Sequence, residues 1–176
     1  MLTELLAPEH LPTTYADRVR AIRRGPSAVL VSLGLDTIPA QPARMFIREG
    51  GLEFGIGNPS VIDQTLAPPG HAALTILCLL SEEVASTWRR GDIDYRGRKT
   101  AFADHLIKVT ERTVMAGLSQ HIIYSEVASP ATFSRYARSI NGNIYGAARK
   151  SMVSPDQDAG AWVDAGRGRN DNRCWN

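Results

Sequence analysis

The sequence has 176 residues, and its 20 lysines and arginines nearly balance 18 aspartates and glutamates, which leaves a formal net charge of +2. Hydrophobic residues make up 43% and charged residues 22%, which excludes a collagen, a disordered chain or a disulfide scaffold. A net charge this small does not indicate a nucleic-acid partner. The two cysteines, Cys78 and Cys174, are too few for a disulfide framework and fit a reducing compartment.

The first predicted element is a helix over residues 14–24, because apolar residues recur there at i, i+4 and i+7 (Tyr15, Val19 and Ile22). The β-branched run at residues 27–35 predicts an interior strand. Residues 45–49 and 52–56 flank Gly50-Gly51, a two-residue hairpin signal that places Arg48 opposite Glu53. After a polar, proline-rich connection, residues 72–80 predict a further, buried strand, the fourth along the chain.

Three more helices are predicted after these strands. Ser81 caps one that ends near Arg90, and the longest covers residues 98–116, with one apolar face (Phe102, Leu106, Val109 and Thr113). The third begins at Ser129-Pro130 and would carry Phe133, Tyr136 and Ile140. This order predicts an α+β fold over residues 1–155, with a mixed or antiparallel sheet of short strands covered by helices. Residues 156–176 lack periodicity and are expected to be a disordered or frameshifted tail.

No targeting segment is predicted at the N-terminus, because no basic stretch precedes the first apolar run. The longest apolar run, residues 72–80, is far shorter than the roughly 20 residues that a spanning helix needs. We therefore expect a cytoplasmic or peripherally membrane-associated protein.

The residues alone predict no autonomous active site. The four histidines and two cysteines show no metal-ligand spacing, and there is no G-x-S-x-G nucleophile motif. Gly55-Ile56-Gly57 begins like a dinucleotide fingerprint, but its third glycine is missing. No metal site is expected, and the catalytic residues stay unknown.

Three motifs, in order, resemble a known family. Pro59–Gly70 is similar to the "PS-x-x-D-x-x-L-A-P-x-G" stretch of the phytoene desaturase, carotenoid isomerase and retinol saturase flavoproteins. Glu126–Tyr136 resembles their "TP-x-T" helix start, although Ser129 stands where threonine is usual, and Gly142–Gly146 resembles the "G-x-x-YG" that follows. Together with "LP-x-x-Y … LGLD" upstream, the likeness covers roughly residues 5–150.

The resemblance implies the substrate-domain part of a two-domain, FAD-dependent oxidoreductase. Neither the family's N-terminal FAD-binding unit nor its C-terminal glycine-rich segment is present in this sequence. The expectation is an internal fragment, or a subunit whose flavin domain is a separate polypeptide. Self-association and peripheral membrane contact are further expectations for such a fragment.

The resemblance also suggests site residues. Tyr145 and Gly146 are candidates for cofactor binding, because the family places this motif shortly before its second flavin-binding segment. Asp63, Trp88 and Phe102 are candidates for binding an apolar substrate. Each has a simpler structural interpretation: Asp63 as a turn residue that bonds its own backbone, Tyr145 as a half-buried aromatic, and the other two aromatics as core.

Two functions follow from the sequence. The first is part of an FAD-dependent oxidoreductase that desaturates, saturates or isomerises a polyene, a carotenoid or retinoid, and that is inactive without the flavin domain. The alternative is a non-catalytic binding or interaction module for an apolar ligand or a protein partner.

Overall fold

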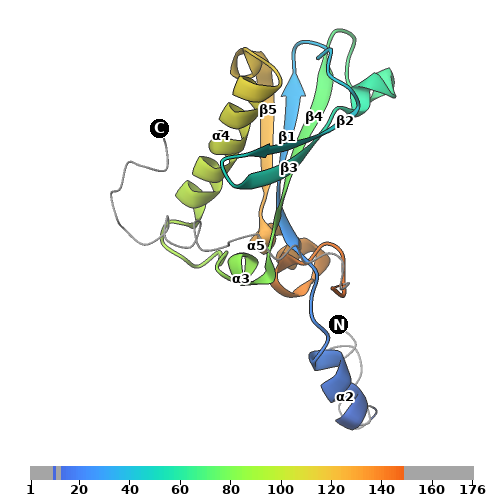
Figure 1. Ribbon diagram of the computed structural model, residues 1–176, viewed down its shortest axis with the longest axis vertical. Coiled ribbons are helices and arrows are strands. Elements are labelled where there is room, and N and C mark those ends of the chain that lie inside the picture. Colours follow the sequence, from blue (N-terminus) through green and yellow to red (C-terminus); the bar gives the residue numbers. More distant parts are fainter. Residues whose placement is uncertain (1–9, 11–12, 149–176) are drawn as a thin grey trace.

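A five-stranded, fully antiparallel sheet forms the body of the protein (Figure 1), seen in a computed structural model that describes residue 10 and residues 13–148. Its strand order is β2-β3-β4-β1-β5. The strands are β1 (Ser27–Leu35), β2 (Arg44–Glu49), β3 (Leu52–Gly57), β4 (Ala72–Leu80) and β5 (Ile122–Ala128). The α-helices described are α2 (Thr13–Arg20), α3 (Glu82–Ser86), α4 (Tyr95–Thr113) and α5 (Pro130–Ala137). The predicted α+β class is confirmed, and the sheet is antiparallel rather than mixed.

The β2–β3 hairpin has the register that its sequence predicts. Arg48 pairs with Glu53 across the strands, and the turn residues Gly50 and Gly51 have φ of +58° and +80°. Both values lie in the left-handed region that glycine adopts without steric cost. The hairpin then extends the sheet because β3 pairs with β4, where Phe54 lies opposite Cys78.

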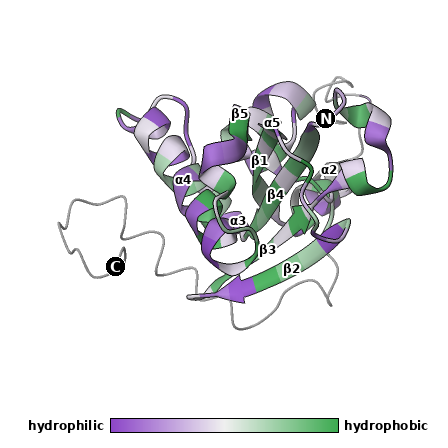
Figure 2. Ribbon diagram, turned by 90° about the horizontal axis from the view of Figure 1, so that it is seen from above, coloured by the Kyte–Doolittle hydropathy of each residue, from purple (hydrophilic) through white to green (hydrophobic). Residues whose placement is uncertain are grey.

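The hydrophobic core lies between one face of the sheet and the helices α3 and α4, which Figure 2 shows on the same side of the strands. In β4 every second residue is buried, from Ala72 to Leu80, as expected of a strand with one covered face. Leu106 of α4 is fully buried against this face. The predicted apolar face of α4 is correct except at its end, because Thr110 is buried and Thr113 is exposed.

Strand β5 is absent from the predicted elements, and the expected order of strands followed by helices is wrong at this point. It lies between α4 and α5 and pairs antiparallel with β1, so that Val31 lies opposite Val127. As an edge strand it exposes most of its residues, and its period-two burial pattern is weak. Its run of β-branched and aromatic residues, Ile122-Ile123-Tyr124, was the available signal.

Several predicted helix boundaries also differ. Helix α2 ends at Arg20 instead of residue 24, and α3 ends at Ser86. The polar, proline-rich connection contains two short 3₁₀ turns, η2 (Pro59–Val61) and η3 (Gln64–Leu66). Two more, η4 (Leu118–His121) and η5 (Ile140–Gly142), flank β5 and α5.

Two helices do not bury the apolar residues expected on them. Figure 1 shows α2 beyond the end of the sheet, and Tyr15 and Ile22 are both exposed. Tyr136 of α5 is 77% exposed, and Ile140 falls outside this helix. Helix α5 stops early because Arg138 has φ of +51°, a left-handed conformation that cannot continue a right-handed helix.

Residues 149–176, including the tail predicted from residue 156, lie outside the described residues. Among the helices that the structure describes, none is both long and apolar enough to cross a bilayer.

Candidate functional site

The sheet has a second face, opposite α3 and α4, which we call the open face. Along β4 it carries the alternate residues Ala73, Thr75, Leu77 and Leu79, which are only partly buried. Strand pairing aligns these residues in rows: Leu77 lies opposite Gly55 of β3 and opposite Leu30 of β1. In this row the half-buried Leu77 lies between Gly55 on one side and the half-buried Leu30 on the other.

A groove with a volume of about 570 Å³ lies over β2, β3 and β4. Its apolar walls are Phe46, Leu77, Leu79 and Tyr145, and Arg48, Glu53 and Gly55 also line it. Ile47 and Phe54 border the groove as well, but their side chains pack in the core on the other face of the sheet. A concave, mainly apolar space of this size is typical of a small-molecule site. Of the lining residues that the structure describes, Tyr145 alone comes from outside these three strands, since it follows η5 in the chain.

Glycines let two aromatic rings lie close to the open face. Phe46 pairs with Gly55 across the hairpin, and a Cβ at Gly55 would lie 3.5 Å from its ring. Tyr124 of β5 pairs with Gly34 of β1 in the same way, its Cβ 3.1 Å from where a glycine Cβ would be. Strand glycines often mark such close approaches. The ring of Phe46 is nevertheless 87% exposed, so it forms a wall of the groove that faces solvent.

The charged groups at the groove neutralise each other. Arg48 and Glu53 form an ion pair across the hairpin, and both side chains remain partly exposed. Among the described residues, the only other titratable side chain in the lining is Tyr145, which is 50% exposed. The groove thus combines apolar walls with one paired charge, which suits an uncharged, hydrophobic ligand.

The two cofactor candidates, Tyr145 and Gly146, are neighbours in the chain, but only Tyr145 is free to contact a ligand. The ring of Tyr145 lines the groove. Both backbone polar groups of Gly146 are already engaged: its N–H donates to Asn143 Oδ1 (2.5 Å), and its carbonyl accepts from Gly25 N–H (2.8 Å). The described residues therefore fit a ring contact from Tyr145 and do not fit a backbone hydrogen bond from Gly146 to a cofactor. Their assignment to a flavin stays a prediction.

Trp88 and Phe102 lie in the core rather than in the groove. They are 5% and 7% exposed and form an edge-to-face pair with ring centroids 5.9 Å apart and an interplanar angle of 86°. The guanidinium of Arg98 stacks over the Trp88 ring at 4.3 Å. These contacts explain both aromatic side chains as packing residues of the core. Their assignment to substrate binding stays a prediction.

Asp63 is exposed in the loop between β3 and β4. Its carboxylate accepts hydrogen bonds from Thr65 N–H (2.9 Å) and Thr65 Oγ1 (2.7 Å). These bonds lower the pKa of Asp63. The geometry is that of a turn residue bonding its own loop, and Asp63 does not line the groove.

The motif positions beside these candidates have structural roles. Ser60 is buried, and its hydroxyl accepts from Ala73 N–H (2.9 Å), which joins the loop to β4. Ser129 is fully buried and forms a capping box with Thr132 at the start of α5, while its hydroxyl bonds Tyr95 Oη (2.7 Å). Much of the family-like pattern is therefore explained by folding requirements.

The described residues offer neither a reactive cysteine nor a cluster of metal ligands. Cys78 is buried in β4, and desolvation raises the pKa of its thiol to about 12, so it is not a nucleophile in the folded state. Within residues 13–148 and residue 10, no three His, Cys, Asp or Glu side chains are grouped so that they could hold a metal ion.

The groove residues Phe46, Leu77 and Leu79 were not among the candidates from sequence. The available signal was in residues 72–80, where the alternate positions 73, 75, 77 and 79 are also apolar at three of the four. A strand that is apolar on both faces predicts a second covered surface. It does not tell which distant segment, here the one carrying Tyr145, completes that surface.

Three chloroplastic prolycopene isomerases are similar to this chain. The protein from Daucus carota is 30% identical over 145 residues, which are 76% of this chain and 23% of the relative. Prolycopene isomerase 2 of an Oncidium hybrid cultivar is 28% identical, and that of Arabidopsis thaliana 27%, each with 76% of this chain and 24% of the relative. No protein-family model matches the chain.

The chain spans less than a quarter of the length of these curated relatives. The similarity confirms the family resemblance drawn from those motifs: this chain is a relative of the carotenoid isomerases of the phytoene desaturase-like family.

Proposed function

We propose that the chain forms the substrate-holding part of an FAD-dependent oxidoreductase that acts on a polyene, and that the open-face groove is the polyene site. The observation that carries the proposal is the groove itself, about 570 Å³ in volume and walled by Phe46, Leu77, Leu79 and Tyr145. A polyene is long, uncharged and apolar, so burial against such walls would supply most of its binding free energy. The relatives are prolycopene isomerases by name, which supports the same class of ligand.

The chemistry would come from a bound flavin rather than from this chain. The titratable groups that the described residues place at the groove are an ion pair and a tyrosine. None of them is an electron or hydride carrier, whereas FAD supplies that chemistry when it is bound. The role of the described residues would be to position the polyene and to exclude water from it. We accordingly expect the chain to be inactive until a flavin-binding domain joins it.

The binding part of the proposal is tested with retinol as a polyene probe, titrated into the purified chain while retinol fluorescence is followed. Saturable binding is expected. Leu77→Asn places a polar amide in the apolar wall and should weaken binding roughly tenfold. Thr75→Asn is the matched control, because Thr75 lies on the same strand and face but does not line the groove. Equal effects of both variants, or no saturable binding, would refute the groove as the site.

The dependence on a flavin domain is tested by gel filtration of the chain with excess FAD. We expect the protein peak to carry no flavin absorbance, because Gly146 has no free backbone donor and the phosphate-binding fingerprint is incomplete. Stoichiometric co-elution of FAD would show that the chain binds the cofactor unaided and would contradict this part of the proposal.

A flavin-binding polypeptide is the partner that we propose for the exposed apolar surface at the groove. Phe46 and Tyr145 are 87% and 50% exposed, and the relatives extend over more than four times the aligned length. Large exposed apolar side chains often mark an interface. Sedimentation over a wide concentration range tests the alternative occupant, since a second copy would give a concentration-dependent dimer.

The non-catalytic binding module is the competing function. It shares the groove and predicts the same retinol binding. The two differ in turnover: with a flavin-domain partner and a poly-cis carotenoid, the first function predicts an altered product and the second predicts none.

A further inference from the structure

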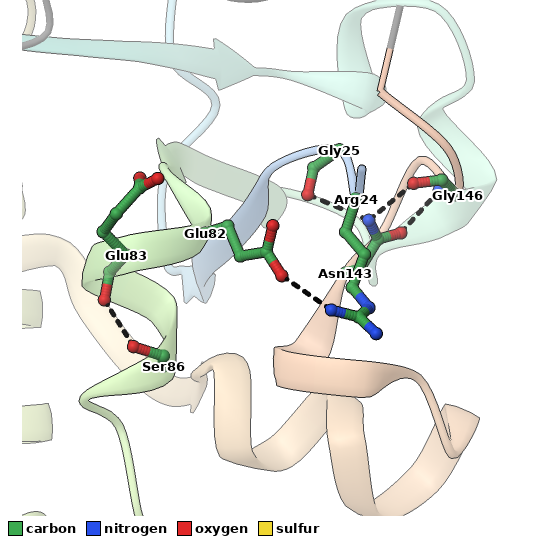
Figure 3. Close-up of polar contacts among 7 residues, drawn as sticks. All are labelled: Arg24, Gly25, Glu82, Glu83, Ser86, Asn143 and Gly146. Carbon is green, nitrogen blue, oxygen red and sulfur yellow. Dashed lines mark hydrogen bonds and ion pairs between the residues drawn. The ribbon is translucent and has the colours of Figure 1, made fainter. Parts of the chain in front are cut away.

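Two chain segments that are far apart in sequence, residues 23–25 and 146–148, run side by side next to Tyr145. Arg24 and Ala147 form an antiparallel bridge. Gly25 N–H donates to Gly146 O (2.8 Å), and Ala148 N–H donates to Arg23 O (2.8 Å). The segment before β1 and the segment after η5 therefore form a short two-stranded pair, part of which Figure 3 shows.

The side chain of Asn143 adds a further link between the two segments and closes the turn that contains Tyr145. Its Nδ2 donates to Gly25 O (2.9 Å) and to Gly146 O (2.6 Å), while its Oδ1 accepts from Gly146 N–H (2.5 Å) (Figure 3). Only a carboxamide offers two donors and an acceptor at one site, so neither aspartate nor alanine can reproduce all three bonds. We call Asn143, Gly25 and Gly146 the bracket.

The bracket fixes the backbone on both sides of Tyr145. Gly146, the next residue, has φ of +75°, and Gly142, three residues before, has φ of +67°. Such values are those of tight, defined turns. Gly25 also limits the space beside the tyrosine, because a Cβ there would lie 3.2 Å from Gly146 O and 3.7 Å from Tyr145 Cβ.

The bracket is in turn tied to the core of the protein. Arg24 forms an ion pair with Glu82 of α3 (3.0 Å), a helix that buries Val84 and Ala85. Ser27 at the start of β1 is buried, and its hydroxyl donates to Gly142 O (2.7 Å). These contacts come from β1 and α3, so the position of the Tyr145 segment is set by the sheet and its covering helix.

We propose that Asn143 is a positioning residue that sets Tyr145 as a wall of the groove, without contacting the ligand itself. This inference rests on the proposed function, since it takes a polyene as the ligand of the groove, and it adds a residue on which binding in the groove depends. Asn143 does not line the groove, whereas Tyr145 does and is separated from it by a single residue. Loss of the Asn143 bonds loosens the turn that carries Tyr145, so that its exposed ring can shift out of its place in the groove.

The test combines a ligand measurement with one that needs no ligand. Retinol affinity is measured for Asn143→Ala, Tyr145→Ala and the double variant. Either single change should weaken binding roughly fivefold, and the double variant should be no weaker than Tyr145→Ala, because both changes remove the same wall. Gln120→Ala is the control, since it removes an exposed carboxamide on η4.

The second measurement is fluorine NMR of the chain labelled with fluorotyrosine, with the Tyr145 signal assigned by Tyr145→Phe. In Asn143→Ala this signal should shift, while that of Tyr95, which bonds Ser129, stays in place and reports an intact fold. Gly25→Ala places a methyl group against Gly146 from the other segment and should also shift the Tyr145 signal. This second variant keeps the test possible if Asn143→Ala does not fold.

The outcomes separate the inference from the proposed function. An unchanged Tyr145 signal in both variants, or additive losses of affinity in the double variant, would overturn the positioning role of Asn143. If the unaltered chain does not bind retinol, the proposed function fails, and the fluorine signal alone decides whether Asn143 positions Tyr145.

Discussion

Substitution of Phe102 distinguishes a packing role from a substrate contact. Its ring is 7% exposed and meets Trp88 edge-to-face at 5.9 Å. Removing the side chain in Phe102→Ala should cost about 3–5 kcal/mol in the free energy of unfolding, a large part of the stability of a typical domain. Phe102→Leu keeps most of the apolar volume and loses the aromatic pair, so we expect about 1–1.5 kcal/mol.

The assay for Phe102→Leu is urea unfolding followed by far-UV circular dichroism, together with retinol titration of the folded variant. We expect a lower unfolding midpoint and an unchanged retinol affinity. Tyr136→Ala is the control, because that ring is 77% exposed and its loss should change stability by less than about 0.5 kcal/mol. Unchanged stability with weakened retinol binding would refute the packing role and favour the substrate contact that the family resemblance suggested.

Three further predictions concern single positions. Ser129→Ala removes a buried helix cap and should lower the free energy of unfolding by about 1–2 kcal/mol in thermal denaturation; an unchanged melting temperature would contradict the capping role. Gly142→Ala should prevent stable folding, because a Cβ there would collide with the backbone of Pro130, whereas Gly70→Ala, also at positive φ but facing open space, should cost only about 1–2 kcal/mol. Cys78, whose pKa is raised to about 12, should resist thiol reagents at about pH 8 until urea unfolds the chain, measured in a variant whose other cysteine is serine; reaction in the folded state would refute its burial.

Local signals in the sequence predicted the elements that depend on neighbouring residues. The Gly50-Gly51 turn fixed the hairpin register, and the Ser129-Pro130 start of α5 was correct because capping is a local interaction. The ends of α2 and α3 were predicted too far along the chain. Helix ends depend on the packing that follows, as at Arg24, which joins a bridge to Ala147 instead of extending α2.

The candidate site was predictable only in part. Tyr145 was identified from the family-like motif and does line the groove, although its proposed role there is with a flavin. Phe46, Leu77 and Leu79 were missed, since a position on the second face of a strand looks the same in sequence whether a helix, a ligand or solvent covers it.

The sequence by itself determined the α+β class, four of the five strands and the relation to carotenoid isomerases, because these depend on periodicity, turn residues and motifs that are read locally. Only the tertiary structure decided that β5 pairs with β1 and that Asn143 joins Gly25 across more than a hundred residues. It also decided that Trp88 and Phe102 lie in the core while Tyr145 lies in the groove. Such contacts between distant segments depend on the packing of the whole sheet, which no local pattern records.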